Sequence, residues 1–416
     1  MKFNKIISNQ CNRNFTKKIK VLLLSSKYQP EYSGSGLRAH NTYKRLKKKY
    51  DINFDVVTSS ISFQGNRIYK YEGKKIYRIS PPFKIKFQKG WYFSRIKNKN
   101  PFRFIKVFLW LSWEIYYSWN YIKKNINQYD LLHTFGNSWS IGFLSWYFAK
   151  NNKPIIRELC NEMSNPLYPI LFRKIMKKIF KKDNTLVVAI SRKLEILAKK
   201  FEMKNVWMRP NPIDENKFFV DFKNKFQLRN KLTKFNSKDI LLSYIANYRL
   251  SKNHIFLIDV LSLLPKKYKM ILRGPLKDEG QEYFNEIKEK IDKFKLHNRI
   301  DIQSGYVGNF DEYLKCSDIF LFPSLTEGLG TPILESQACG VPVIANNLKN
   351  VVDIYIKNGK GGNCLELDAY KWAKTIEKVI KIKKKNLIKN SLDINSKASS
   401  SVIDKEYFKR INNLIN

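Results

Sequence analysis

The sequence contains few cysteines and histidines. Five Cys and four His are spread over 416 residues, and no Cys-x-x-Cys pair or Cys/His cluster has the spacing of a zinc site. Because the cysteines are far apart and odd in number, we expect reduced thiols rather than a disulfide framework. These absences exclude a structural zinc domain and a small disulfide-stabilised secreted domain.

Acidic residues are also scarce. Asp and Glu number 35 against 78 Lys and Arg, so the formal net charge is +43. Such an excess favours anionic partners, namely a membrane surface, nucleic acid or a phosphorylated substrate. Much of it is lysine spread along the chain, and we interpret about half of it as compositional bias of a solvated surface. Nothing resembles a DNA- or RNA-reading module, so we expect no nucleic-acid partner.

The N-terminus lacks an apolar run. The first twenty residues are basic and have no hydrophobic region of the kind found in a signal peptide. We therefore expect a cytoplasmic protein.

The most aromatic stretch of the chain runs from Phe104 to Ile122. Its polar residues do not gather on one broad helical face, which predicts a helix that is apolar nearly all round. Lys106 and Glu114 argue against a bilayer span, since each is costly near a membrane centre. A core helix and a helix that docks on a membrane or a lipid acceptor are the two interpretations.

The length allows two domains with separate cores. Short apolar runs alternate with helical stretches, which predicts parallel sheets covered by helices. No repeat of 20 to 50 residues marks a solenoid or propeller. The expected strands are 20–26, 54–58, 129–136, 153–158, 185–191, 240–246, 268–274, 299–305, 318–322 and 341–345.

The stretch from Pro323 to Pro342 joins the strand 318–322 to a helix. Thr331 is the expected N-cap, Pro332 suits the first helical position, and Gly340 ends the helix. Glycines in the preceding loop let the backbone approach a ligand closely. The loop and the helix start therefore predict a site for an oxygen-rich or anionic ligand.

Two carboxylates flank this helix start. Glu327 lies in the loop, and Glu335 follows eight positions later, about one turn into the helix. Both can face a ligand that lies across the helix start and accept hydrogen bonds from sugar or ribose hydroxyls. A capped helix with two solvated acids is the alternative interpretation.

The segment E-G-L-G-T-P-I-L-E resembles the E-x7-E signature of the retaining nucleotide-sugar glycosyltransferases of family 4, which have the GT-B fold. Further similarities follow in family order over nearly the whole chain. They are the glycine loop 34–36, a strand ending in His133, the connection 209–218, and Arg249 with Lys252.

The resemblance implies an α/β fold with two doubly wound, parallel-sheet, Rossmann-like domains that face each other across a cleft. Residues 1–207 are expected to form the acceptor-side domain and residues 208–398 the domain that binds the donor nucleotide sugar. Residues 399–416 resemble the last helix of GT-B enzymes, which crosses back to the first domain.

The resemblance also assigns roles on the donor side. Arg249 and Lys252 are expected to neutralise the donor diphosphate and the charge that grows on the leaving group; two solvated bases are the alternative. Glu327 is expected to contact the transferred sugar and Glu335 the ribose. The remaining donor-binding candidates are Gly34, Gly36, Gly328, Leu329, Gly330 and Thr331.

No cofactor or metal is expected. The chain has no Asp-x-Asp pair, which binds the metal ion in the other large glycosyltransferase fold. Arg249, Lys252 and the helix start are expected to do the electrostatic work of a metal ion instead.

The acceptor side departs from the family. His133 matches the first histidine of a family segment, but Phe135 stands where many relatives carry a second one, and a lone histidine at a strand end is more often structural. The segment Leu159-Cys160-Asn161-Glu162 stands where many relatives carry a His-Asp pair. His133 and Asn161 are therefore weak candidates for acceptor contacts.

The resemblance implies a glycosyltransferase that moves a sugar from a nucleoside diphosphate sugar, with retained anomeric configuration, to a saccharide or lipid-linked acceptor in the synthesis of a surface polysaccharide or glycolipid. The expected location is the cytoplasm, with peripheral binding at the inner face of the membrane. A GT-B nucleotide-sugar epimerase and a catalytically silent GT-B scaffold protein are the alternatives.

Overall fold

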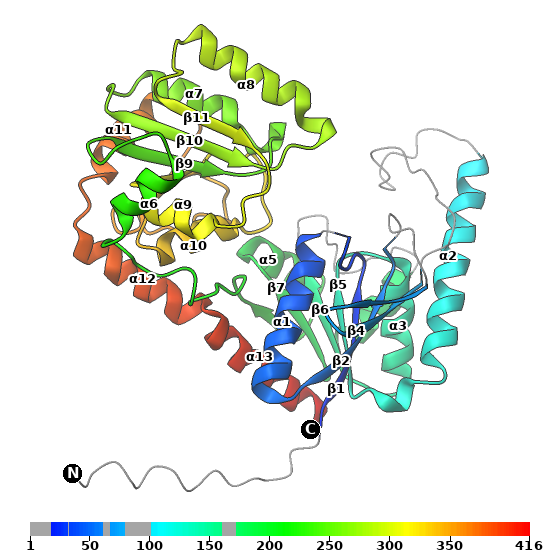
Figure 1. Ribbon diagram of the computed structural model, residues 1–416. Helices are drawn as coiled ribbons and strands as arrows, with labels where there is room; N and C mark the ends of the chain where they lie inside the picture. Colours follow the sequence, from blue (N-terminus) through cyan, green and yellow to red (C-terminus); the bar gives the residue numbers. More distant parts are fainter. Residues whose placement is uncertain (1–17, 32, 61–66, 80–100, 160–171) are drawn as a thin grey trace, which may run out of the picture. The chain divides into compact units, whose positions relative to one another are not determined.

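A computed structural model describes residues 18–31, 33–60, 67–79, 101–159 and 172–416 (Figure 1). The chain forms two compact units. The first comprises Met1–Glu158, Leu167–Leu186 and Arg410–Asn416, and the second comprises Leu159–Pro166 and Val187–Lys409. The domain boundary expected between residues 207 and 208 stays a prediction.

An eight-stranded, largely parallel sheet has the strand order β3-β4-β2-β1-β5-β6-β7-β8; its strands lie in the first unit up to the start of β7, while the rest of β7 and β8 fall in the second. β1 pairs in parallel with both β2 and β5, and among the described strands the hairpin of β3 with β4 is antiparallel. The strands are β1 (Lys20–Ser25), β2 (Asn53–Thr58), β3 (Ile68–Tyr71), β4 (Lys74–Arg78), β5 (Leu131–Phe135), β6 (Ile155–Leu159), β7 (Thr185–Ala189) and β8 (Val206–Met208).

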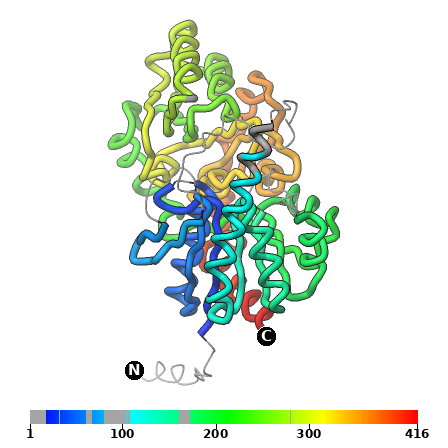
Figure 2. The backbone as a smooth tube through the Cα atoms, turned by 90° about the vertical axis from the view of Figure 1, so that its right-hand side faces the viewer, coloured from blue at the N-terminus to red at the C-terminus, as the bar shows by residue number. Residues whose placement is uncertain are grey.

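Helices cover this sheet. α1 packs on β1, β2 and β5, while α3 packs on β5 and carries α2 and α4 on its other sides. Both views show α2 and α3 side by side (Figures 1 and 2). The helices are α1 (Gly34–Tyr50), α2 (Pro101–Ile122), α3 (Trp139–Lys150), α4 (Arg173–Ile179) and α5 (Arg192–Lys200), with a short 3-10 turn, η2 (Ile126–Gln128).

The second unit contains a six-stranded parallel sheet with the order β11-β10-β9-β12-β13-β14. The chain order reverses between β9 and β12, and in open α/β sheets ligands bind beyond the carboxyl ends of strands at such a point. The strands are β9 (Ile240–Ile245), β10 (Tyr268–Gly274), β11 (Ile300–Ser304), β12 (Ile319–Phe322), β13 (Val343–Asn346) and β14 (Gly362–Leu365).

Helices lie on both sides of this sheet (Figure 1). On one side α7 packs against both α8 and α11, and α6, α9, α10 and α12 form the second group. The helices are α6 (Lys225–Leu232), α7 (His254–Ser262), α8 (Gln281–Lys293), α9 (Phe310–Cys316), α10 (Thr331–Ala338), α11 (Ala369–Val379), α12 (Lys384–Ala398) and α13 (Ser400–Ile415).

A buried ionic network fastens α6 beneath this sheet. The guanidinium of Arg229, with no exposed surface, donates to the carbonyl oxygens of Cys316 and Asp239 and to the Asp318 carboxylate, 2.8 Å away. Asp318 also accepts from the Lys225 ammonium. A charge this deeply buried persists only when its donors are all used, so we interpret the network as structural.

Glu215 joins the segment after β8 to the start of α13. Its carboxylate accepts hydrogen bonds from the backbone N–H and the hydroxyl of Ser400, at 2.9 and 2.7 Å, and from the N–H of Ser401. Burial acts to raise the pKa of Glu215, but these hydrogen bonds outweigh it and lower the pKa to about 2. Glu215 therefore stays ionised and caps the helix.

The predicted strands are confirmed in their existence, since each of the ten expected stretches contains one. Four strands were not predicted, namely the β3–β4 hairpin and the short β8 and β14. Helix α1 begins at Gly34, so the expectation of a glycine loop at residues 34–36 is wrong. Gly34 and Gly36 belong to the first turn of α1 itself.

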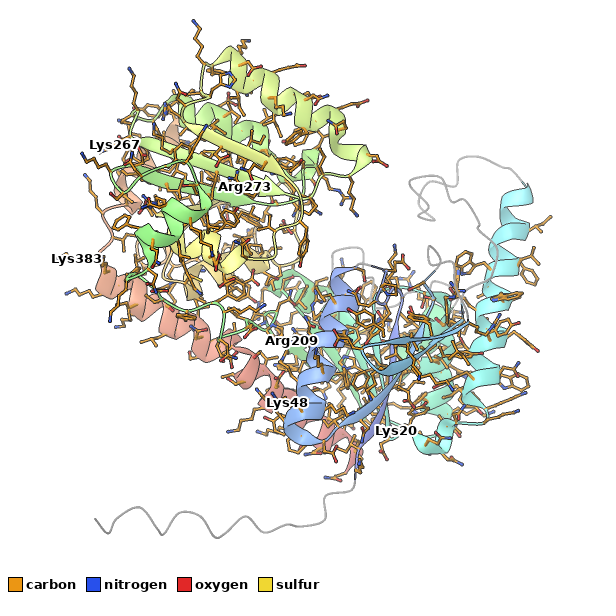
Figure 3. All side chains as sticks on the ribbon, viewed as in Figure 1. Lys20, Lys48, Arg209, Lys267, Arg273 and Lys383 are labelled. Carbon is orange, nitrogen blue, oxygen red and sulfur yellow. The ribbon has the colours of Figure 1, made fainter. Side chains whose placement is uncertain are left out.

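The basic residues differ in their exposure to solvent. Figure 3 labels Lys48, Lys267 and Lys383, which are exposed, beside Arg209 and Arg273, which are buried. Arg209 donates to the Tyr407 hydroxyl at 2.6 Å and Arg273 to the Asp301 carboxylate at 2.6 Å. The lysines are solvated surface, whereas the two arginines hold elements together.

Candidate functional site

The start of α10 lies at the carboxyl end of β12. Gly330 occupies the N-cap position with a left-handed backbone (φ 79°), and Pro332 lies in the first turn. The predicted N-cap role of Thr331 is wrong, because Thr331 is the first helical residue. No described side chain caps this helix. Its first N–H groups therefore lack a capping side chain, which is the condition for binding an oxygen-rich ligand.

A second loop, between β9 and α7, meets the loop before α10. The N–H of Leu325 donates to the carbonyl of Ser251 at 2.9 Å. The Tyr244 hydroxyl donates to the carbonyl of Lys252 at 2.9 Å and lies 3.1 Å from Ser324 Oγ. Segments about 75 residues apart are thus joined at one edge of the sheet.

Two predicted site residues meet in these loops. The Lys252 ammonium forms an ion pair with the Glu327 carboxylate, and both side chains are largely buried, with 23% and 16% exposed. Arg249, which precedes the 3-10 turn Leu250–Lys252, is exposed. The structure therefore pairs Lys252 with Glu327. The sequence interpretation had assigned Lys252 to the donor diphosphate and Glu327 to the transferred sugar.

Glu335 lies within α10 and is partly buried. Burial raises the pKa of its carboxyl group to about 8. No described residue offers this carboxyl group a hydrogen bond or an ion pair. A carboxyl group without a protein partner beside an uncapped helix start is suited to receive a ligand hydroxyl.

Asn211 approaches the same helix start, and its contribution was not predicted. Its Nδ2 donates to the Thr331 hydroxyl at 2.7 Å, and its Oδ1 is buried without a partner among the described residues. Asn211 stands in the connection 209–218 on which the resemblance rests, but sequence alone did not show that the amide reaches α10.

His254, the first residue of α7, packs beneath the β9–α7 loop as a buried residue. It is fully buried, and its ring lies 4.7 Å from the rings of both Tyr244 and Tyr248. Burial lowers the pKa of His254 to about 3, so the ring is neutral. The sequence around β9 gave no signal that these three rings pack together.

Gly34 and Gly36, the glycines of the first unit that we predicted to bind the donor, lie in the capped first turn of α1. Ser33 Oγ caps α1 by accepting from the N–H of Gly36 at 3.0 Å. A Cβ atom on Gly36 would lie 2.3 Å from the carbonyl oxygen of Lys27, whereas one on Gly34 would meet nothing within 4 Å. Gly36 is therefore required by packing, and a donor role for both stays a prediction.

The acceptor-side candidate His133 is fully buried in the middle of β5, which continues to Phe135, so the expectation that the strand ends at His133 is wrong. Its Nδ1 lies 2.8 Å from the Tyr43 hydroxyl and its Nε2 lies 3.5 Å from Glu158. Phe135 is buried against it, with 4.4 Å between the ring centroids. Glu158 was not predicted. Asn161, the other acceptor-side candidate, lies outside the described residues.

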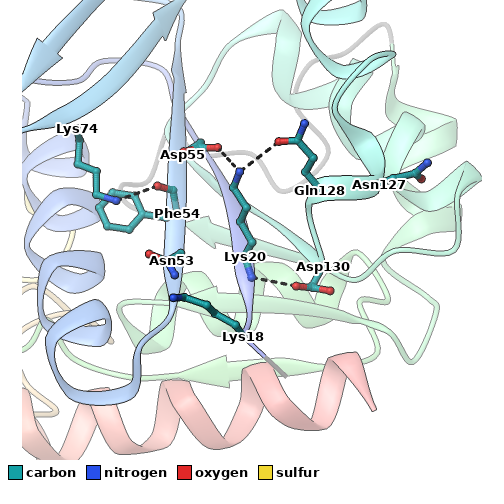
Figure 4. A pocket seen from close by; sticks show the side chains of 9 residues that line it. All are labelled: Lys18, Lys20, Asn53, Phe54, Asp55, Lys74, Asn127, Gln128 and Asp130. Atoms are coloured by element: carbon teal, nitrogen blue, oxygen red, sulfur yellow. Dashed lines mark hydrogen bonds and ion pairs between the residues drawn. The ribbon is translucent and has the colours of Figure 1, made fainter. Parts of the chain in front are cut away.

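A pocket of about 570 Å³ lies elsewhere, at the amino ends of β1 and β2 (Figure 4). Lys20 crosses it, with its ammonium 2.9 Å from Asp55 and its N–H donating to Asp130 at 2.9 Å. The pocket lies at the amino ends of these parallel strands, whereas ligands of open α/β sheets bind beyond the carboxyl ends, and the Lys20 ammonium is already paired with Asp55. We assign it no role in the candidate site.

The described residues hold no group of three or more His, Cys, Asp or Glu side chains that could bind a metal ion. Within the same residues, no helix has the length and hydropathy needed to cross a membrane.

Residues 224–396 match the family of glycosyl transferases group 1. A capsular polysaccharide biosynthesis glycosyltransferase of Staphylococcus aureus, CapH, is 32% identical over 168 residues, which are 39% of this chain and 45% of CapH. The UDP-Gal:alpha-D-GlcNAc-diphosphoundecaprenol alpha-1,3-galactosyltransferase of Escherichia coli is 28% identical over 166 residues, 38% of this chain and 41% of that protein. The chain thus spans about half the length of these curated relatives.

Solved structures extend the likeness to the whole fold. HepE of Anabaena, solved in complex with UDP and glucose, superposes with a TM-score of 0.68 over 95% of this chain and 100% of its own, at 14% identity. The predicted fold class, an α/β protein with two parallel-sheet Rossmann-like domains of GT-B type, is confirmed. Within it, residues 224–396 contain the two joined loops, Arg249, Lys252, Glu327 and Glu335.

Proposed function

We propose that the protein is a retaining, metal-independent glycosyltransferase that uses a nucleoside diphosphate sugar as donor. The observation that carries the proposal is the junction of the β9–α7 and β12–α10 loops inside the segment that matches glycosyl transferases group 1. That junction combines a helix start without a side-chain cap, two cations and two acids at a sheet edge suited to ligands.

The donor diphosphate lies across the start of α10 in this proposal. Its phosphate oxygens accept hydrogen bonds from the backbone at Gly330 and Thr331 and are neutralised by Arg249 and Lys252. As the glycosyl bond breaks, negative charge grows on the leaving phosphate, and the same cations stabilise it more strongly. HepE, with UDP in its solved complex, supports a uridine nucleotide as the first donor to test.

The two acids have separate tasks. Glu327 contacts hydroxyl groups of the transferred sugar, and its ion pair with Lys252 fixes its position. Glu335 accepts hydrogen bonds from the ribose. The retained configuration rests on the resemblance to family 4.

The acceptor is a saccharide or a lipid-linked saccharide in the synthesis of a surface polysaccharide or glycolipid. The names of two relatives support this class, one from capsular polysaccharide biosynthesis and one acting on a diphosphoundecaprenol-linked sugar. We place the enzyme in the cytoplasm, bound peripherally at the inner face of the membrane.

The purified protein, incubated with a panel of nucleotide sugars, tests the proposal. We expect slow release of nucleoside diphosphate from one donor without acceptor, and faster release when a suitable acceptor is added. An epimerase would release nucleotide and free sugar at a rate that no acceptor changes. Binding of a donor with no turnover under any condition would indicate a silent scaffold and contradict the proposal.

A further inference from the structure

Helix α2 presents a continuous apolar face that nothing in the described structure covers. Large apolar side chains with 43% to 66% of their surface exposed recur at helical spacing along it. At 100° per residue, their positions fall within an arc of roughly 100°. These outer-face residues are Ile105, Phe108, Leu109, Tyr116 and Trp119.

The opposite face of α2 is anchored in the first unit. Trp110, Glu114, Ser118 and Ile122 recur every fourth position and are all buried. The Glu114 carboxylate accepts from Trp110 Nε1 at 2.7 Å and from the N–H of Ser140, in the first turn of α3, at 3.0 Å. The inner face is therefore fixed to α3, and the outer face cannot rotate inward.

The chemistry of the outer face matches a membrane interface. Tyr116 and Trp119 lie toward the C-terminal end of the helix, and the Lys123 ammonium lies 4.0 Å from the centre of the Trp119 ring. Aromatic rings with adjacent lysines are the side chains favoured at the level of lipid headgroups. The only acidic residue of α2, Glu114, points inward.

We infer that the outer face of α2 docks on an anionic lipid surface and lies in its headgroup region. The inference extends the proposed function by placing the enzyme where a lipid-linked acceptor is found. Apolar side chains enter the acyl boundary, and exposed Lys123 and Lys124 meet the headgroups. The net charge of +43 adds long-range attraction to a negative surface.

A second copy of the chain is a poorer occupant of this face. Two chains that each carry +43 repel each other, and like-charge juxtaposition opposes association. An anionic bilayer attracts the positively charged chain and can also bury the apolar face of α2. The exposed helix face alone would fit either occupant, so the charge decides between them.

The packing of α2 decides which residues test the inference. Trp110 and Trp113 are unsuitable, because Trp110 is buried and donates to Glu114, and Trp113 packs on Tyr117. The informative substitution is Phe108→Ser with Trp119→Ser. A control is Leu392→Ser with Tyr370→Ser, two apolar residues on α12 and α11 that are at least as exposed as Phe108 and Trp119 on average.

Co-sedimentation of the full chain with vesicles tests the inference. We expect the wild type to bind vesicles of phosphatidylglycerol and phosphatidylcholine, to release them as salt rises, and to bind pure phosphatidylcholine weakly. Phe108→Ser with Trp119→Ser should weaken binding about tenfold or more without a large change in melting temperature, since both residues are exposed. The control should bind like the wild type.

Equal loss of binding in both double variants, or no binding by the wild type, would overturn the inference. Light scattering that shows a dimer of the wild type and a monomer of Phe108→Ser with Trp119→Ser would assign the face to a second copy instead. The assay uses neither donor nor acceptor, so its failure would leave the proposed glycosyl transfer standing.

Discussion

The sequence predicts two helix starts, those of α1 and α10, as binding sites for the donor nucleotide sugar. They differ in whether a side chain caps their first backbone N–H groups. Helix α1 is closed by its own Ser33 side chain, which accepts from Gly36 at 3.0 Å. Helix α10 begins at Gly330 with no side-chain cap, and the ion pair of Lys252 with Glu327 stands in the loops beside it. Glycine at a helix start therefore accompanies two different features, close packing of Gly36 in α1 and a start without a side-chain cap at Gly330 in α10.

We therefore propose that the donor diphosphate lies at the start of α10, in place of the predicted donor role of Gly34 and Gly36 at α1. The side-chain cap of α1 already uses the N–H of Gly36, whereas the start of α10 has no side-chain cap. If the assignment is right, changes at α10 and its neighbouring loop will damage donor chemistry, and changes at α1 will not. The following predictions test this contrast in order of expected effect.

Lys252→Ala and Arg249→Ala should have the largest effect. Each should lower kcat/KM about 5- to 150-fold, which corresponds to a loss of roughly 1–3 kcal/mol of transition-state stabilisation. Both kcat and KM should suffer, because a cation on the leaving group acts in the ground state and in the transition state. Lys267→Ala, an exposed lysine on the second unit, is the control. Steady-state transfer rates unchanged in both variants would remove these residues from the site.

Glu327→Gln should reduce turnover more than Glu335→Gln. The loop acid contacts the transferred sugar and holds Lys252, whereas the helix acid is assigned to the ribose and should affect KM. The two substitutions are matched in size and chemistry, so steady-state kinetics compare them directly. A larger loss of kcat in Glu335→Gln, with donor affinity intact, would reverse the two roles.

Gly330→Ala should destabilise the protein by about 1 kcal/mol, because its φ of 79° is unfavourable for a residue with a Cβ atom. The melting temperature should fall by roughly 2–4 °C. Gly34→Ala should leave it unchanged or slightly raised, since its Cβ meets nothing within 4 Å. Thermal scans in which Gly34→Ala is the less stable variant would contradict the contrast between the two helix starts.

The pH dependence of stability should reveal Glu335. Burial raises its pKa to about 8, above the value of about 4.3 in an unfolded chain. Between these values the folded protein binds more protons than the unfolded one, so its free energy of unfolding falls as pH rises. Glu335→Gln removes this term, and its melting temperature relative to the wild type should therefore rise from about pH 5 to about pH 8.5. A constant difference would show that Glu335 is not desolvated.

The strand pattern was predictable because each central strand is buried on both sides and therefore reads as a continuous apolar run. The β3–β4 hairpin and β14 were missed because they are partly exposed and carry charged or polar residues. β8 was missed because its apolar run, Val206–Met208, is only three residues long and only partly buried.

The candidate site was predictable as far as local motifs reach. Arg249, Lys252, Glu327 and Glu335 follow from short segments, but the partners of these residues depend on tertiary contacts. The Lys252–Glu327 pair and the hydrogen bond from Asn211 to Thr331 join residues 75 and 120 positions apart, and no local spacing encodes them. Likewise, only the packing of α2 on α3 separates its buried Trp110 from its exposed Trp119.

Calorimetric titration of UDP and GDP into the wild type, Lys252→Ala and Gly34→Ala tests most directly whether the donor diphosphate lies at the start of α10. We expect one of these nucleotides to bind the wild type and Gly34→Ala with the same affinity, and to bind Lys252→Ala at least about tenfold more weakly. Weakened binding in Gly34→Ala together with unchanged binding in Lys252→Ala would contradict the account and move the diphosphate to the start of α1.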